Sequence, residues 1–398
     1  MRQTGANQER AQIANRELVL RILQHKQICS RAELAKQSGL QQATITHIIN
    51  DFLQWKVVDE TGLLSGAKGR RSIGLCISDE KYRVIGFRLT RQYYTIGVFA
   101  LNGRETAPRQ VFQIGETAPQ VIIDQACRTI NELIRDDPGH SFLAVGVAVP
   151  GPYFQDNGEI AMISAFPGWK NIKIQQMMQA QISIPVIVDH DANAGALAES
   201  CLVAENDMYD TLVYISVGQG IGAGIVEHGE VYRGAQGIAG EIGHTCIDFR
   251  GELCDCGGRG CLTLYASTIA ITKKMRLAFS DPNMTFPQVV QLIRNKNETA
   301  LRIFHETMQY LGIGIINLIY TYNPGCIVIG DEMSAIGQMI LDDLSAYVQQ
   351  MNVPRLGNAL RIQLAKVDSD SAYVGAAILA SRYVFSDIER FCNSGIDA

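Results

Sequence analysis

The hydrophobic positions near the start of the chain recur at the spacing of one helix face. Within residues 16–26, apolar side chains stand at Leu18, Val19, Ile22 and Leu23. Residues three and four apart lie on the same side of an α-helix. This segment is therefore predicted to form an amphipathic helix.

A helix-start signal follows. The Ser30 hydroxyl and the Glu33 carboxylate can each accept a hydrogen bond from a backbone N–H group that a helix start leaves free. A short helix is predicted to begin here and to run through Gln37, and Gly39 is expected to supply the turn after it.

A second helix is predicted after this turn, over residues 42–55. Its apolar face carries Ile45, Ile48, Ile49, Phe52 and Leu53. Its outward face carries amide, hydroxyl and imidazole groups on Gln42, Thr44, Thr46, His47 and Asn50. Such groups can hydrogen-bond to base edges and phosphates in a DNA major groove. Two helices joined in this order by a glycine turn are typical of a helix-turn-helix unit.

The residues after this unit predict a two-stranded wing. Two apolar runs, residues 57–58 and 73–77, flank a glycine-rich loop. The basic residues of that loop are Lys68, Arg70 and Arg71. We expect them to contact phosphates or a narrow minor groove. Helix order, turn glycine and basic wing favour a DNA-binding head over the alternative, a three-helix packing module with a solvated basic loop.

Strand and helix patterns alternate in the rest of the chain. Strand-like runs are predicted at residues 82–89, 94–101, 142–152, 211–217 and 222–227, with a helical stretch at 118–134. The alternation predicts an α/β fold, and its two similar halves indicate one duplicated architecture. We divide the chain into residues 1–80, 81–200 and 201–398.

Composition is that of an ordinary globular protein. The chain has 398 residues, of which 47% are hydrophobic, and this length allows two or three domains with proper cores. The first residues are polar and charged, and no stretch is apolar for the length of a membrane span. We expect a cytoplasmic protein without membrane insertion.

The charge is unevenly distributed. The formal net charge is −5, but residues 1–75 carry 11 Lys and Arg against 6 Asp and Glu. A basic head on an acidic body suggests that only the head meets an anionic partner, although chance alone can also give such an imbalance.

Three cysteines and a histidine fall close together in the segment EIGHTCIDFRGELCDCGGRGC, residues 241–261. Thiolates of Cys254, Cys256 and Cys261 with the imidazole of His244 make the Cys3His set that closes around a structural zinc ion. A disulfide is the alternative, but nothing marks the chain for an oxidising compartment, and a bridge within Cys-x-Cys is strained. We therefore expect one structural zinc ion per chain.

The same segment resembles the ROK family, which contains repressors, sugar kinases and uncharacterised open reading frames. The resemblance rests on Glu-x-Gly-His followed by Cys-x-Cys-Gly-x-x-Gly-Cys, and it extends over roughly residues 10–385. The stretch SRAELAKQSGLQQATITHIINDFLQWKVV also looks like the head of family repressors. The resemblance implies a winged helix-turn-helix followed by a two-lobed, actin-like body, whose second lobe holds the zinc loop, residues 244–261, and the C-terminal helices.

The resemblance further implies a sugar pocket. Asp191 stands where a strand gives way to a helix, at the position of the base that takes a sugar hydroxyl proton in family kinases. A plain helix cap is the alternative role for Asp191. Glu241 and His244 stand at family sugar-contact positions, and the family histidine also holds the zinc.

The implied pocket departs from the family pattern. His190 replaces an asparagine, Thr263 replaces a glutamate, and Ala165 stands where asparagine is frequent. The His190-Asp191 pair resembles that of family repressors that respond to a protein partner. Sugar recognition is therefore expected to be altered or lost. Trp169 either lines the mouth of the cleft or belongs to the core.

The phosphate-binding hairpin of family kinases is also changed. Its Asp-x-Gly-x-Thr pattern corresponds here to residues 86–91, with Arg88 in place of the aspartate and Thr90 in place of glycine. Asp331 stands where a second glycine is common in the family. A cation has thus replaced a magnesium ligand, so ATP binding and kinase activity are not expected.

These inferences converge on a DNA-binding transcriptional regulator, a repressor of carbohydrate genes whose kinase-like body senses a sugar, a sugar derivative or a protein partner. We expect a homodimer or a dimer of dimers on a palindromic DNA operator. One alternative is an active sugar kinase with a regulatory head. Another is a zinc-stabilised body that binds a protein and carries a vestigial head.

Overall fold

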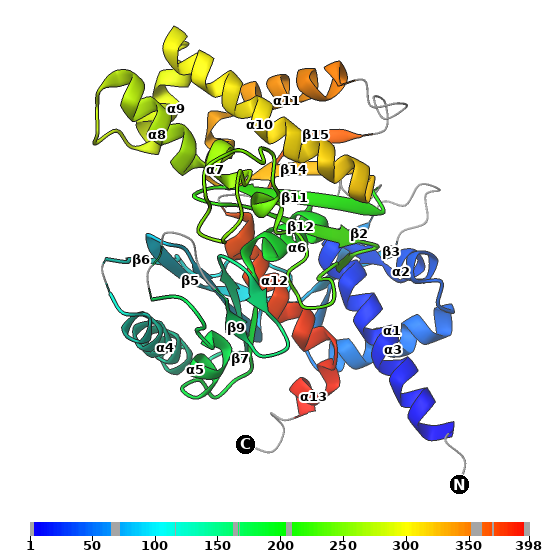
Figure 1. The fold of residues 1–398 in the computed structure, drawn as a ribbon. Helices are drawn as coiled ribbons and strands as arrows, with labels where there is room; N and C mark the ends of the chain where they lie inside the picture. The colour runs from blue at the N-terminus through cyan, green and yellow to red at the C-terminus, as the bar shows by residue number, and fades with distance from the viewer. Residues whose placement is uncertain are drawn as a thin grey trace.

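A computed structural model describes residues 4–64, 72–115, 117–161, 166, 168–203, 209–351, 360–367 and 370–393. It consists of an N-terminal head and a body of two lobes, each built on a five-stranded mixed sheet (Figure 1). Among the helices within these ranges, none combines the length and the apolar character that a membrane crossing requires.

The head contains three helices and a small antiparallel sheet of order β1-β3-β2. Its elements are α1 (Thr4–Lys26), β1 (Cys29–Ser30), α2 (Arg31–Ser38), α3 (Gln42–Gln54), β2 (Val58–Leu64) and β3 (Ser72–Ile77). The predicted capping box is confirmed, since the Glu33 N–H donates to the Ser30 hydroxyl and the Ser30 N–H donates to the Glu33 carboxylate. Gly39 follows α2 at φ 70°, a left-handed conformation that glycine adopts without steric cost.

The helices of the head share one apolar core. Four of the five predicted core residues of α3 are fully buried: Ile45, Ile48, Ile49 and Phe52. The prediction for α1 needs one correction, because Leu18 is 38% exposed while Leu20 is completely buried. The buried face of α1 is centred between Val19 and Leu23, and Leu20 lies closer to that line than Leu18 does.

The two lobes have the same sheet topology. The first sheet has the order β10-β7-β4-β5-β6 and the second β13-β12-β11-β14-β15. In each, an antiparallel three-stranded meander is extended by two strands parallel to its first strand. This equivalence confirms the predicted α/β fold with its two related lobes.

The strands of the first sheet are β4 (Tyr82–Leu89), β5 (Tyr93–Ala100), β6 (Gln110–Gln113), β7 (Ser141–Val149) and β10 (Val186–His190). Those of the second are β11 (Thr211–Val217), β12 (Ile221–Glu227), β13 (Glu230–Val231), β14 (Cys326–Gly330) and β15 (Arg361–Leu364). A separate small hairpin pairs β8 (Tyr153–Phe154) with β9 (Glu159–Ile160).

Helices cover the outer faces of both sheets. The first lobe carries α4 (Pro119–Asp136) and α5 (Ile174–Gln179). The second carries α7 (Thr263–Ala266), α8 (Thr268–Phe279), α9 (Phe286–Arg294), α10 (Glu298–Tyr322) and α11 (Gln338–Gln350). The layers are visible in Figure 1.

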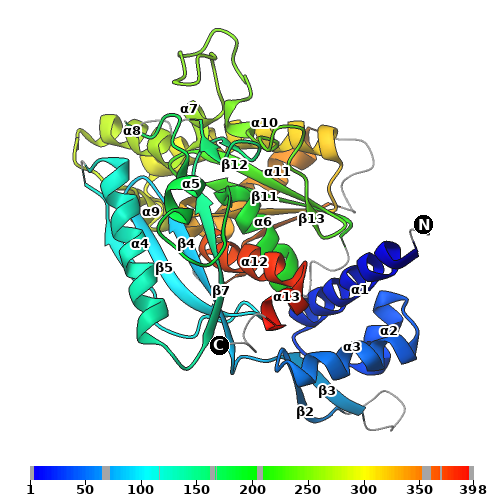
Figure 2. The ribbon, with the colours of Figure 1, turned by 90° about the horizontal axis from the view of Figure 1, so that it is seen from below.

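Two further helices, α6 (Asp191–Leu202) and α12 (Ser371–Phe385), lie between the sheets. Although α6 follows the first sheet in sequence, it packs on β12 of the second, and α12 packs on β4 and β7 of the first. The last helix, α13 (Ile388–Asn393), reaches the head (Figure 2). The boundaries at residues 80 and 200 stay a prediction.

Candidate functional site

A pocket lies between the lobes, at the ends of strands from both sheets. It is formed by the end of β4, the β10–α6 junction, the β11–β12 hairpin, the 3-10 helix η2 (Ile242–His244) and the end of β14. The lining residues that the sequence analysis named are Arg88, Thr90, His190, Asp191, Glu241, His244, Thr263 and Asp331. All four residues predicted for the sugar pocket are thus brought together.

Three polar side chains form one wall of this pocket. His190 is the N-cap of α6, and its Nε2 lies 3.2 Å from Asp191 Oδ1 and 3.8 Å from Glu241 Oε1. Burial opposes the charged imidazole, but the carboxylates of Glu241, Asp191 and Asp189 outweigh it and raise the pKa of His190. Burial raises the pKa of both Asp191 and Glu241, and His190 partly offsets this. The wall offers several hydrogen-bonding atoms to a hydroxyl-rich ligand.

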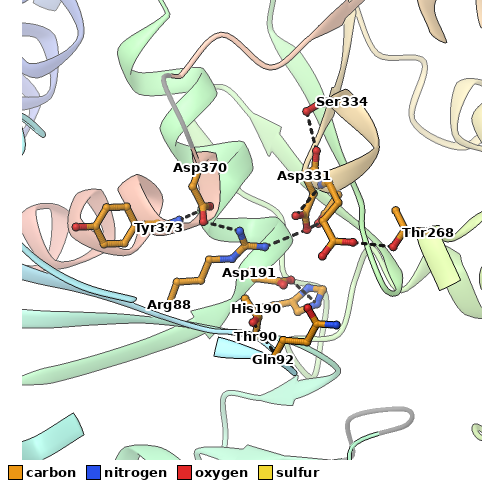
Figure 3. Close-up of polar contacts among 12 residues, drawn as sticks. Arg88, Thr90, Gln92, His190, Asp191, Thr268, Asp331, Ser334, Asp370 and Tyr373 are labelled. Atoms are coloured by element: carbon orange, nitrogen blue, oxygen red, sulfur yellow. Dashed lines mark hydrogen bonds and ion pairs between the residues drawn. The ribbon is translucent and has the colours of Figure 1, made fainter. Parts of the chain in front are cut away.

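Arg88 is held between two carboxylates (Figure 3). Its Nη2 donates to Asp331 Oδ2 at 3.0 Å, and its Nη1 donates to Asp370 Oδ2 at 2.6 Å. The Arg88 side chain is 6% exposed and each carboxylate is 13% exposed. The Ser216 hydroxyl also donates to Asp331 Oδ2, at 2.7 Å.

The charges in this cluster stabilise one another. Burial disfavours the guanidinium, but Asp331 and Asp370 outweigh it and raise the pKa of Arg88 above its ordinary value. Burial alone would raise the pKa of Asp331, yet Arg88 brings it below the usual range. The sequence pattern links neither Arg88 to Asp331 nor either of them to Asp370, so this cluster was not predicted. The signal that could have joined them is a pair of opposite departures from the family pattern: Arg88 stands in place of an aspartate, and Asp331 in place of a glycine.

The turn after β4 is closed by a side chain. The Thr90 hydroxyl donates to the Tyr93 carbonyl at 2.7 Å and accepts from the Tyr93 N–H at 3.0 Å. The threonine thus stabilises a turn at a position where the family resemblance implies glycine.

The predicted metal ligands lie together beside the pocket. The ligand atoms of His244, Cys254, Cys256 and Cys261 are all within 4.8 Å of one another. Cys256 Sγ lies 3.6 Å from Cys261 Sγ, and Cys254 Sγ lies 3.6 Å from His244 Nδ1. Zinc–sulfur bonds of about 2.3 Å in a tetrahedron separate two sulfur atoms by about 3.8 Å.

The donor set therefore fits a tetrahedral zinc ion. All ten cysteines of the chain are free, so no disulfide competes for these thiols. His244 belongs both to this cluster and to the pocket wall. A metal bound here would fix the wall that carries Glu241.

The head presents polar side chains on α3. Gln42, Thr46, His47 and Asn50 are exposed, while Thr44 is half-buried. Gln41, the N-cap of α3, forms no side-chain cap hydrogen bond. The wing residues Lys68, Arg70 and Arg71 lie outside the described residues.

Trp169 belongs to the core of the first lobe. Its side chain is 1% exposed and stacks on Phe166 with 5.3 Å between ring centroids. It does not line the pocket. Ala165 lies outside the described residues.

Comparison with known proteins agrees with this geometry. The model of the ROK family matches residues 84–383. The chain belongs to the ROK family. This ROK protein is 29% identical over 391 residues to the putative xylose repressor of Caldicellulosiruptor sp. (strain Rt8B.4), covering 94% of this chain and 97% of that protein. It is 26% identical over 395 residues to the DNA-binding transcriptional dual regulator NagC of Escherichia coli (strain K12), covering 94% of each.

One solved structure extends the likeness to the complete fold. A ROK family transcriptional regulator, a homologue of the E. coli MLC protein, matches this ROK protein with a TM-score of 0.80 at 24% identity. The match covers 97% of this chain and 100% of the other, so it includes the head. The predicted architecture of an N-terminal head on a two-lobed body is confirmed.

Proposed function

We propose that this ROK protein is a sequence-specific DNA-binding transcriptional repressor of carbohydrate-metabolism genes. The observation that carries the proposal is the polar face of α3, where Gln42, Thr46, His47 and Asn50 are exposed on a helix-turn-helix unit. Relatives that match over 94% of this chain bear the names putative xylose repressor and DNA-binding transcriptional dual regulator NagC. Thr44 at the helix start and the basic wing complete the proposed DNA surface.

The body is proposed to sense a sugar, a sugar derivative or a protein partner. Asp191 and Glu241 offer carboxylate oxygens to vicinal hydroxyls, and His190 and His244 complete the wall. Binding in the pocket would shift the population toward an arrangement of the heads that misses the operator half-sites. A panel of D-xylose, N-acetylglucosamine and their phosphates, read by thermal stability, identifies a small-molecule inducer through linkage. A panel without any shift directs the search to a protein partner.

Kinase activity is not part of the proposal. Arg88 is paired with Asp331 and Asp370 at the hairpin that would otherwise meet magnesium and phosphate. One observation favours the alternative of an active sugar kinase with a regulatory head, namely that Asp191 keeps the position of the family base at the start of α6. Measurement of hexose-dependent ATP hydrolysis decides between them, and turnover would support the kinase.

We also propose an assembly, a metal content and a division into domains. We infer a cytoplasmic homodimer or dimer of dimers, because paired heads match a palindromic operator. His244, Cys254, Cys256 and Cys261 would hold one structural zinc ion. The proposed units are a head at residues 1–80 and lobes at 81–200 and 201–398.

Recovery of bound fragments from sheared genomic DNA tests the central claim. The purified full-length protein is expected to enrich a single palindromic sequence. Asn50→Ala should lower the enrichment and relax the preference at one base position. Arg135→Ala, which changes an exposed arginine of α4 in the body, is the control and should leave the enrichment unchanged. Absence of any enriched sequence would favour the protein-binding body with a vestigial head.

A further inference from the structure

The helix α6 begins at the pocket, and α12 begins at an ion pair with the pocket residue Arg88. Asp191 is the first residue of α6 and lines the pocket. Asp370 is the N-cap of α12, where its carboxylate accepts from the Tyr373 N–H at 3.0 Å and from Arg88 at 2.6 Å. Figure 3 shows these groups around Arg88. A change in the pocket therefore acts directly on the first turns of both helices.

The two helices pack backbone against backbone. A Cβ atom added at Gly375 of α12 would lie only 1.9 Å from the Ala194 carbonyl oxygen of α6. On the other side of α6, a Cβ atom at Gly224 of β12 would lie 2.2 Å from the Ala192 carbonyl oxygen. Interfaces packed this closely do not deform continuously, so a displacement at one end is passed along the helices.

The opposite ends of the two helices reach the head. His25 Nδ1 of α1 lies 2.9 Å from the carbonyl oxygen of Cys201 near the end of α6. Arg382 of α12 donates to Cys201 Sγ at 3.0 Å, which joins the two helix ends. At 1.5 Å per residue each helix is roughly 20 Å long. The pair thus connects the pocket to α1.

A second contact continues to α3. Glu389 of α13, which follows α12, forms an ion pair with Arg16 of α1. The same guanidinium donates to Asp51 of α3 at 2.7 Å and lies over the Trp55 ring, 4.9 Å from its centroid. The Arg16 side chain is only 6% exposed, so salt screens its contacts less than those of a surface pair.

We propose that the α6–α12 pair transmits the state of the pocket to the head, with His25–Cys201 and Arg16–Glu389 as the contacts at the head. The inference rests on the proposed function, in which pocket and head belong to one regulator. A ligand that moves Asp191, or that separates Arg88 from Asp370, shifts both helices together and with them α1 and α3. The pocket then controls how the head is oriented on the body.

Hydrogen–deuterium exchange on the full chain, without DNA or ligand, tests this link. The pocket end is perturbed by Arg88→Met and, separately, by Asp370→Asn, which keeps a side-chain oxygen to cap α12. Both variants are expected to raise the exchange of the amides in residues 16–26 several-fold. In a background with His25→Ala and Glu389→Gln, the same changes should add no further increase there.

A matched control breaks an ion pair formed within the head. Arg31 and Glu60 pair at 3.0 Å between α2 and β2, so Glu60→Gln should leave the response of α1 to Arg88→Met intact. If both pocket variants alter exchange only in β4 and the first turn of α12, with α1 unchanged, the proposal is overturned. Because no DNA is present, that outcome is independent of whether the protein is a repressor.

Discussion

Arg88 and Asp331 lie 243 residues apart in the chain and form a buried ion pair, with 3.0 Å between Nη2 and Oδ2. The pair joins the end of β4 in the first lobe to the end of β14 in the second. Each residue departs from the pattern that the family resemblance implies, and the two departures compensate each other in charge. A buried charge without its partner is costly, so neither residue can be lost alone without a penalty.

A double-mutant cycle measures this dependence. Arg88→Met leaves Asp331 and Asp370 without a cation and should lower the free energy of unfolding by about 3–5 kcal/mol. Adding Asp331→Asn removes one unpaired charge, so the double variant should lose about 1–3 kcal/mol less than the sum of the single variants. Urea denaturation gives the values. The exposed pair Arg31–Glu60 serves as control, with an expected coupling below about 1 kcal/mol. If the losses of unfolding free energy on Arg88→Met and Asp331→Asn were additive, the ion pair between them would contribute nothing measurable to stability.

A comparison of the cluster of Arg88, Asp331 and Asp370 with the head shows which features the sequence alone could predict. The capping box joins Ser30 and Glu33, which are three positions apart, and the apolar face of α3 repeats within one helix, so local patterns determine both. The metal cluster is likewise confined to residues 244–261. The cluster forms only because two sheets and α12 converge on Arg88, Asp331 and Asp370. No periodic pattern in the sequence indicates that convergence. For the same reason the sequence does not decide whether Trp169 lines the cleft or belongs to the core, since its neighbours are set by the folded lobe.

Removal of one thiol tests the metal cluster. Cys254→Ser should release the zinc ion, because the serine hydroxyl is a much weaker ligand than a thiolate. The expected result is a loss of one zinc per chain by elemental analysis and a Tm lower by several degrees, since bound metal stabilises only the folded loop.

Cys246→Ser is the matched control for that change. Cys246 is exposed and lies opposite Cys261 in an isolated backbone bridge, but it is not among the four clustered ligands. This variant should keep its zinc and its Tm. Unchanged metal content in the Cys254→Ser protein, or zinc loss in the Cys246→Ser protein, would refute the ligand assignment.

The two proposed kinds of DNA contact should respond differently to substitution. Asn50→Ala removes an amide from the exposed face of α3 and should weaken operator binding by about 1–3 kcal/mol while relaxing the preference at one base position. Arg70→Ala with Arg71→Ala should weaken binding to every sequence and reduce the slope of log K against log salt concentration by about 2. Fluorescence anisotropy at several salt concentrations measures both. A loss confined to one operator in the wing variant would contradict a phosphate-contact role.

The contact between α6 and α12 gives a prediction about packing. Gly375→Ala would bring a Cβ atom to 1.9 Å from the Ala194 carbonyl oxygen. A backbone atom cannot move aside as easily as the end of a flexible side chain can. The helices must then separate, which should lower the stability by about 1–3 kcal/mol or more. Gly115→Ala is the matched control, because a Cβ atom there meets no atom within 4 Å. Thermal denaturation should show a clear drop in Tm for Gly375→Ala and almost none for Gly115→Ala. Equal Tm values would mean that α6 and α12 can move apart freely, which would also remove the basis for transmission from the pocket to the head.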